Sequence, residues 1–234
     1  GDVYKRQIME GKDLSAGAVA GLKHVKHPIN AAYAVKTKSP HVMLSGAGAE
    51  EFAKEQGLEM VEDNMYFATP KTMEWIEKLK QESKKNGTVG CVVLDKQGNL
   101  TAGTSTGGMF KKRWGRIGDS PVIGAGTYAD NNSCAVSCTG HGEYFIRHAV
   151  AFDVCARYKY LKESVEKAAD YIIHTELNTN AGNGGLIAVD KLGNIAMPYN
   201  SGGMFRGFLY KEKGSPEIKK GCGIGKKIVV VGEK

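Results

Sequence analysis

The chain has 234 residues, of which 41% are hydrophobic, 24% are charged and 31 are glycine, values typical of one soluble, turn-rich domain and not of a disordered or fibrous protein. The net charge of +7 comes from 32 basic and 25 acidic residues spread along the chain, without the clustering that a nucleic-acid footprint requires. No apolar run reaches the roughly 18 residues of a membrane-spanning helix.

The five cysteines are odd in number, and none forms the Cys-x-x-Cys pair found in many zinc sites. His24 and His27 are three residues apart, but Pro28 follows at once and no partner motif accompanies them. We therefore predict no metal site, and free thiols in a reducing, cytoplasmic compartment.

The first part of the chain is predicted to be mainly helical. Pro28 suits the first turn of a helix, and Gly57 suits the position just after one. Polar residues 83–86 end the last of these helices and form a candidate exposed linker. The predicted helices cover 28–36, 49–55 and 72–85, and a short strand covers 41–44.

From Thr88 the pattern changes to strands: an apolar run at 89–94, a turn and a second run at 100–106 predict a β-hairpin. A shift of 95 residues aligns 90–111 with 185–206, and nine of the twenty-two positions are identical. Two copies are too few for a solenoid. We therefore expect two similar hairpins in the sheets of one core.

The two copies differ at positions that matter for chemistry. Where the first has Thr88 the second has Asn183, and where the first has Thr106 the second has Ser201. A purely structural repeat would not need the Thr88 hydroxyl. Between the copies, 143–160 and 163–177 have helical composition with apolar residues able to face a sheet, which predicts layered α+β packing.

A Gly-Thr pair alone is typical of the entrance to a strand. Thr88, however, follows the polar linker and precedes three glycine-rich polar clusters, at 104–108, 115–121 and 139–143. Glycine lets backbone amides approach a substrate closely. The context therefore favours a functional role for Thr88.

These segments, in this order, resemble the plant-type asparaginases of the isoaspartyl peptidase/L-asparaginase family. The resemblance extends from Ile8 to about Tyr210 and includes 8–11 and 16–19. The motifs that carry it are Gly-Thr-Val-Gly at 87–90, Thr-Ser-Thr-Gly-Gly at 104–108, Gly-Arg-Ile-Gly-Asp-Ser-Pro at 115–121, Gly-Ala-Gly-Thr-Tyr-Ala at 124–129 and Thr-Gly-His-Gly-Glu at 139–143.

The resemblance implies an α+β fold, a four-layer αββα sandwich of the N-terminal-nucleophile hydrolase type. It also implies self-cleavage between Gly87 and Thr88, which divides one composite domain into an α-subunit portion at 8–87 and a β-subunit portion at 88–234. The freed Thr88 would carry a hydroxyl nucleophile and an α-amine whose usual pKa of about 8 suits a base near neutrality.

Further roles are carried over by motif position. Thr106 would hydrogen-bond and orient the nucleophile, while the Thr139 hydroxyl and the Gly140 amide would form an oxyanion hole. His141 is left without a catalytic role, because the α-amine already serves as the base.

The resemblance also implies a site for the substrate head group. Arg116 would bind its α-carboxylate as a two-pronged donor, and Asp119 with the Gly142 carbonyl would hold its α-ammonium. The implied substrates are small molecules, L-asparagine or β-aspartyl dipeptides. The implied partner is a second copy in an (αβ)2 dimer, with no cofactor for catalysis and no nucleic acid or membrane.

Residues 1–7 depart from the family pattern, since Arg6 and Gln7 stand where the family has small and acidic residues. The family's first strand, its histidine-glycine turn and its structural sodium loop have no counterpart in this sequence. We therefore expect an N-terminally truncated fragment with a foreign or artefactual leader at 1–7. A missing strand would leave an unpaired sheet edge and impair self-cleavage.

Two alternatives stay open. The first is a glycosylasparaginase-like hydrolase that removes N-linked sugar from asparagine, which the sequences at 107–109 and 139–142 disfavour. The second is an inactive, truncated basic binding domain that kept the fold, which the charge of +7 favours.

Overall fold

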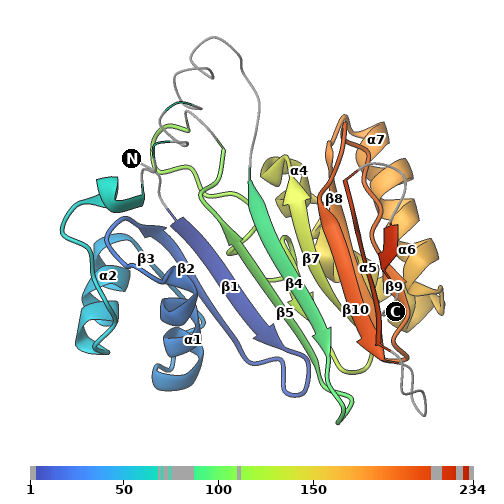
Figure 1. Cartoon of the computed structure of the whole chain (residues 1–234), viewed down its shortest axis with the longest axis horizontal. Coiled ribbons are helices and arrows are strands. Elements are labelled where there is room, and N and C mark those ends of the chain that lie inside the picture. Colours follow the sequence, from blue (N-terminus) through green and yellow to red (C-terminus); the bar gives the residue numbers. More distant parts are fainter. Residues whose placement is uncertain are drawn as a thin grey trace.

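The structure, a computed structural model, describes residues 4–67, 70, 74, 87–109, 112–211, 218–224 and 229–231. Two β-sheets lie between two groups of helices, so the layers follow the order α, β, β, α (Figure 1). This order confirms the predicted α+β sandwich. The predicted helix at 72–85, apart from Glu74, and the linker at 83–86 lie outside the described residues.

The first sheet has five strands in the order β3-β2-β1-β5-β4, with β1 at its centre. Lys5, Gln7 and Met9 alternate along β1 and are buried, whereas Tyr4 and Ile8 pack against the helices on the opposite face. The strands are β1 (Tyr4–Glu10), β2 (Ala16–Leu22), β3 (Met43–Ser45), β4 (Thr88–Leu94) and β5 (Leu100–Thr106).

The β1–β2 hairpin is not apparent from the sequence pattern. Residues 5–7 are all polar, and β2 consists mainly of alanine and glycine, so neither strand shows an alternation of polar and apolar residues. Even so, β1 pairs with β2 along one side and with β5 along the other, and the expected unpaired edge is not found at this strand. Pairing does not reveal where a segment comes from, so the foreign leader at 1–7 stays a prediction.

The second sheet is antiparallel, in the order β6-β7-β8-β9. Its strands are β6 (Thr127–Ala129), β7 (Cys134–Gly140), β8 (Gly184–Asp190) and β9 (Ile195–Ala196). Apolar side chains of both sheets form one buried cluster between them, which includes Met9, Leu100, Ala102, Ala135 and Val189. Burial of this cluster holds the sheets face to face.

Helices cover the outer face of each sheet. On the first sheet, α1 (Pro28–Lys38) and α2 (Gly46–Glu55) bury Val35 and Ala53 against β2, which confirms the helices predicted at 28–36 and 49–55. On the second sheet lie α4 (Gly142–Arg147), α5 (Val150–Leu161), α6 (Val165–Tyr171), the π-helical turn η2 (Ile172–Glu176) and α7 (Leu177–Thr179).

The segment of helical composition at 143–160 forms two helices, α4 and α5. The chain breaks between α4 and α5 at Ala149, whose φ of 45° lies in the left-handed region. The next helix begins after Ser164, whose hydroxyl accepts a hydrogen bond from the Lys167 amide at 3.2 Å, a usual N-cap contact.

Two smaller elements complete the described fold. A 3-10 turn, η1 (Asn64–Phe67), follows α2. A separate three-stranded antiparallel sheet consists of β10 (Arg206–Lys211), β11 (Ile218–Gly223) and β12 (Val229–Val231).

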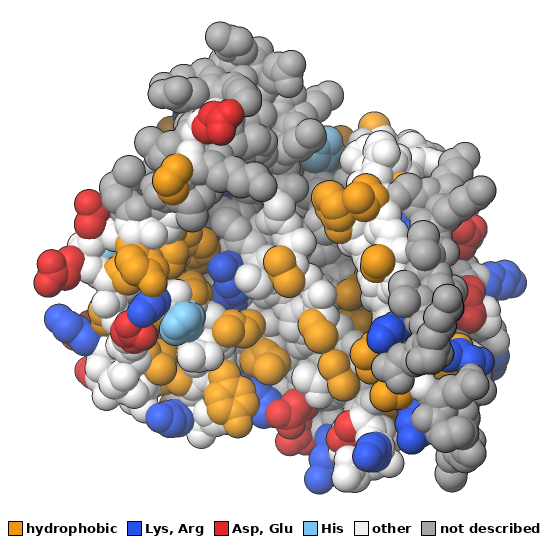
Figure 2. All heavy atoms as spheres, viewed as in Figure 1, with side chains coloured by type: hydrophobic (Ala, Val, Ile, Leu, Met, Phe, Trp, Pro, Cys, Tyr) orange, Lys and Arg blue, Asp and Glu red, His pale blue; other side chains and the backbone are white. Residues whose placement is uncertain are grey.

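Charges of both signs lie close together on the molecule. On the face shown in Figure 2, basic and acidic side chains of the described residues are interspersed and do not form one continuous basic patch. Across the described ranges, no helix is long and apolar enough to cross a membrane.

The two predicted hairpins have turns of the same geometry. The Asp95 carboxylate accepts hydrogen bonds from the Gln97 and Asn99 amides, and the Asp190 carboxylate accepts them from the Leu192 and Asn194 amides. Gly98 and Gly193 have φ values of 84° and 90°, which glycine adopts without strain. The repeat is therefore structural, with one copy in each sheet.

We predict that the two turns differ in their importance for stability. Asp190 is only 1% exposed, so Asp190→Ala leaves its amide donors without a partner and lowers the free energy of unfolding by about 2 kcal/mol. Asp95→Ala, in the exposed copy, lowers it by less, because water replaces the carboxylate. Urea unfolding of both variants measures the difference, and equal losses would contradict the explanation.

Candidate functional site

The residue predicted as the nucleophile, Thr88, is half-buried at the start of β4, directly opposite Thr106 at the end of β5. The Thr106 hydroxyl donates to the Gly87 carbonyl at 2.8 Å and accepts from the Gly108 amide at 2.9 Å. Thr106 therefore contacts the peptide bond predicted to be cleaved, which joins Gly87 to Thr88.

The packing of the two sheets places the C-terminal end of β7 at the same end of the molecule as the start of β4. A Cβ atom on Gly90 would lie 2.3 Å from the Ser137 hydroxyl, so β4 and β7 are in direct contact there. Farther along β4, Val92 packs in the same buried cluster as Ala135. The start of β4 and the end of β7 thus lie at one end of the stacked sheets (Figure 1), which places Thr88 near residues 139–140.

Gly140 is a position where only glycine fits. Its φ of 152° is one that other residues rarely adopt, and a Cβ atom there would lie 2.4 Å from the Asn183 carbonyl oxygen. The next amide, that of His141, donates to the same carbonyl at 2.9 Å. The backbone of the predicted oxyanion hole is therefore held by the chain leading into β8.

The residues predicted to bind the substrate head group lie together. A Cβ atom on Gly142 would lie 2.7 Å from Asp119 Oδ1 and 3.0 Å from Arg116 Nη2. Arg116 Nη1 lies over Gly118, where a Cβ atom would be 2.6 Å away. Small residues on both sides thus make room for the guanidinium group.

Glu143 is a part of this group whose contact was not anticipated. Its two carboxylate oxygens accept hydrogen bonds from Arg116 Nε and Nη2, each at 2.8 Å, and the Arg116 guanidinium lowers the pKa of Glu143. Glu143 lies in the 139–143 motif, but the motif does not reveal the pairing, because the two residues are far apart in the sequence. The fork geometry leaves Nη1 as the donor available to another carboxylate.

Asp119 is a buried carboxylate that lacks sufficient partners. It is 6% exposed, and its Oδ2 atom is buried without a hydrogen bond. The pKa of Asp119 is raised to about 6: burial is the largest cause, Glu143 adds to the rise, and Arg116 opposes it. An unpartnered carboxylate oxygen is costly, and a bound cation would relieve the cost.

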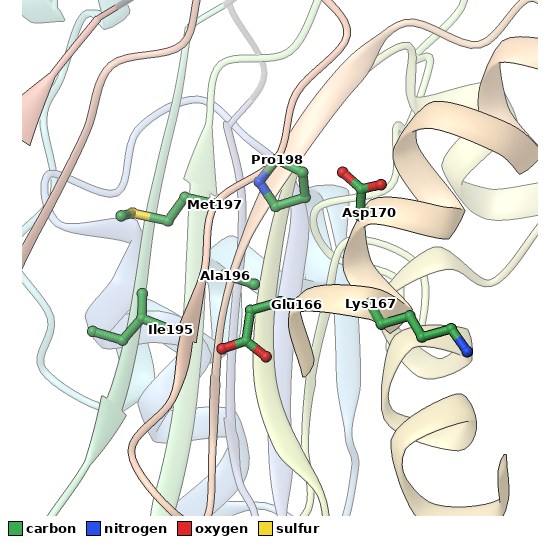
Figure 3. Close-up of a pocket in the computed structure, with 7 residues that line it drawn as sticks. All are labelled: Glu166, Lys167, Asp170, Ile195, Ala196, Met197 and Pro198. Carbon is green, nitrogen blue, oxygen red and sulfur yellow. The ribbon is translucent and has the colours of Figure 1, made fainter. Parts of the chain in front are cut away.

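Other features of the structure do not coincide with this group. A surface hollow of about 470 Å³ lies between α6 and β9 with the two residues that follow β9 (Figure 3), and none of the predicted site residues lines it. Among the described residues, no three His, Cys, Asp or Glu side chains lie close enough together to hold a metal ion. The hollow is lined by Glu166, Lys167, Asp170, Ile195, Ala196, Met197 and Pro198.

Comparisons with known proteins agree with the motifs. The profile of the family described as Asparaginase matches residues 5–218. The isoaspartyl peptidase of Salmonella typhimurium is 48% identical, and the alignment covers 87% of this chain and 69% of the relative. The isoaspartyl peptidase of Escherichia coli is 43% identical over 88% and 72% of the two chains. The isoaspartyl peptidase/L-asparaginase of Homo sapiens is 40% identical over 84% and 66%.

The contact between Thr106 and the Gly87 carbonyl predicts a role in chain cleavage. Thr106→Val removes the hydroxyl and is expected to slow cleavage at 87–88 by about 5- to 30-fold, since one hydrogen bond to the reacting carbonyl is worth roughly 1–2 kcal/mol. Thr106→Ser keeps the hydroxyl and should restore most of the rate.

Intact mass spectrometry over time measures this rate. Thr101→Val is the matched control, because Thr101 lies on the same strand but on its opposite face. Equal rates in Thr106→Val and Thr101→Val would show that the Thr106 hydroxyl takes no part.

Proposed function

Because the chain belongs to the asparaginase family, we propose that it is a threonine-nucleophile amidohydrolase that hydrolyses the amide bond at the side-chain carbonyl of L-asparagine or β-aspartyl dipeptides. The observation that carries the proposal is the hydrogen bond from the Thr106 hydroxyl to the Gly87 carbonyl. This bond lies at the end of the molecule where β7 ends. A threonine at this site becomes a nucleophile with its own base only when the 87–88 peptide bond is cut.

The first step of the proposed mechanism is this cleavage. It converts the Thr88 amide nitrogen, which cannot accept a proton, into an α-amine with a usual pKa of about 8. The amine takes the proton of the Thr88 hydroxyl as the oxygen attacks the substrate carbonyl carbon, and an oxyanion develops. The Thr139 hydroxyl and the Gly140 N–H stabilise it, and donors of this kind contribute about 3 kcal/mol each.

Collapse of the oxyanion expels the amine of the substrate, which takes up a proton, and leaves an ester on Thr88. Water then attacks the ester with the α-amine as base, which releases aspartate and restores the hydroxyl. The proposed steps use a hydroxyl, an amine and backbone donors, so they require no cofactor.

The head group of the substrate is recognised by the cluster beside this centre. Arg116, held by Glu143, offers Nη1 to the α-carboxylate. Asp119, whose Oδ1 lies on the side of Gly142, and the carbonyl of Gly142 receive the α-ammonium. The two charges of the head group thus meet a cation and an anion at a fixed spacing, while the leaving amine contacts neither.

The proposal extends to the partner and the compartment. By resemblance to the family, the active form is an (αβ)2 dimer of cleaved chains that acts on small molecules and not on nucleic acid or membranes. A cytoplasmic compartment is supported by the five cysteines, which are all free thiols.

Intact mass after purification and incubation, with Thr88→Ala as the control, tests the nucleophile. The parent should give two fragments split between Gly87 and Thr88, and Thr88→Ala should stay whole. The cleaved parent should release ammonia from L-asparagine or the free amino acid from a β-aspartyl dipeptide, and should act more slowly on an asparagine carrying an N-linked sugar. A parent that is neither cut nor active would overturn the proposal.

The buried position of Asp119 predicts a pH dependence. An ionised Asp119 binds the α-ammonium and a protonated one does not, so recognition of this group should be lost as pH falls through about 6. The measurement is the ratio of kcat/KM for L-asparagine to that for succinamate, which lacks the α-amine. Because both substrates use Thr88, titration of the base cancels in the ratio.

The ratio should rise with pH through about 6 and level off above it. A ratio that does not change between pH 5 and pH 8 would show that Asp119 does not bind the ammonium.

A further inference from the structure

Two glycines allow the backbones of β7 and β8 to lie very close together beside the proposed oxyanion hole. Gly140 pairs with Gly184 across the sheet, and a Cβ atom on Gly184 would lie 2.2 Å from the Thr139 carbonyl oxygen and 2.8 Å from Gly140 Cα. Neither backbone can move toward the other. The position of residues 183–184 therefore limits where the Gly140 amide can point.

A hydrogen bond ties the same two segments on the other side of Gly140. The His141 amide donates to the Asn183 carbonyl at 2.9 Å. Since Gly140 has a φ of 152° and no side chain, its own conformational preference is weak. The orientation of its peptide units is thus set by what holds Asn183 and Gly184 in place.

Asn200 is the residue that holds them. Its Oδ1 accepts from the Gly184 amide at 2.8 Å, and its backbone amide donates to the Gly184 carbonyl at 2.9 Å. Its Nδ2 group shares its two hydrogens among three acceptors: the Gly182 carbonyl at 3.0 Å, the Ile173 carbonyl at 3.1 Å and Asn178 Oδ1 at 2.7 Å. One side-chain amide thus joins the π-helical turn η2, the loop after α7 and the first residue of β8.

We infer that Asn200 is a positioning residue for the oxyanion hole: it fixes Gly184 and, through it, the Gly140 amide. The inference rests on the proposed function for its catalytic meaning, but the contacts that carry it are independent of Thr88. Among the described residues, the hydrogen bonds of Asn200 go to Gly182, Gly184, Ile173 and Asn178 and to none of the residues proposed to contact the substrate, so its effect is on their geometry. An asparagine suits the task because it offers an acceptor and two donors on one short side chain.

The test compares Asn200→Ala with Asn178→Ala. The Asn178 side chain hydrogen-bonds to Asn200 and to the His174 carbonyl, but not to Gly184. Asn178→Ala therefore controls for a general weakening of the loop. In Asn200→Ala the kcat of the cleaved enzyme should fall by about 10- to 100-fold with KM within about twofold. Asn178→Ala should keep a kcat within about threefold of the parent value.

A second readout does not depend on activity. Hydrogen exchange at the His141 amide, followed by mass spectrometry on peptides that cover 139–145, should be about tenfold faster in Asn200→Ala and unchanged in Asn178→Ala. Unchanged exchange in Asn200→Ala, or equal increases in both variants, would overturn the inference. So would faster exchange with an unaltered kcat. A parent without hydrolytic activity would instead refute the proposed function, and faster exchange in Asn200→Ala alone would still support the positioning of residues 140–141.

Discussion

The arrangement of the candidate site depends on the register between the two sheets, which is set where Gly90 of β4 meets Ser137 of β7. No side chain other than hydrogen fits at Gly90, because a Cβ atom would lie 2.3 Å from the Ser137 hydroxyl. The same hydroxyl lies 2.6 Å from Thr104 Oγ1, which accepts from Thr127 Oγ1 at 2.5 Å. These buried hydrogen bonds join β5, β6 and β7. Unlike the apolar contacts around them, hydrogen bonds are directional, so they favour one relative position of the strands. A shift of either sheet would separate Thr88 from residues 139–140.

The charged cluster of Arg116, Asp119 and Glu143 is governed by a second constraint, the free-energy cost of burying charge. Arg116 has a partner in Glu143, whereas Asp119 keeps one oxygen without a hydrogen bond, and burial raises its pKa to about 6. Removing an ion from water is offset only by close partners. The site therefore holds a cation that is already positioned and an anion that gains most from a ligand. This imbalance favours a zwitterionic head group over a simple carboxylate.

The repeat gives the two hairpins different tasks. The position that carries Thr88 in the first copy carries Asn183 in the second, and the Asn183 carbonyl supports the peptide after Gly140. One copy thus carries the proposed nucleophile, and the other helps to hold the backbone donor proposed for the oxyanion hole. The shared turns at Asp95 and Asp190 keep the strands alike, while the strand ends have diverged in chemistry.

The sequence by itself determined the features that depend on local or motif information: the β4–β5 hairpin, the helices after Pro28 and before Gly57, the repeat, the family and the candidate residues around Thr88. It did not predict β1 and β2, whose polar and small residues lack an alternating pattern, nor the break at Ala149. Only the tertiary structure decided that Glu143 holds Arg116, that one buried oxygen of Asp119 has no hydrogen bond and that Asn200 supports Gly184. These relations join residues that are distant along the chain. Hydrogen bonds and interactions between buried charges depend on distances in space, and the packing of the folded chain sets those distances.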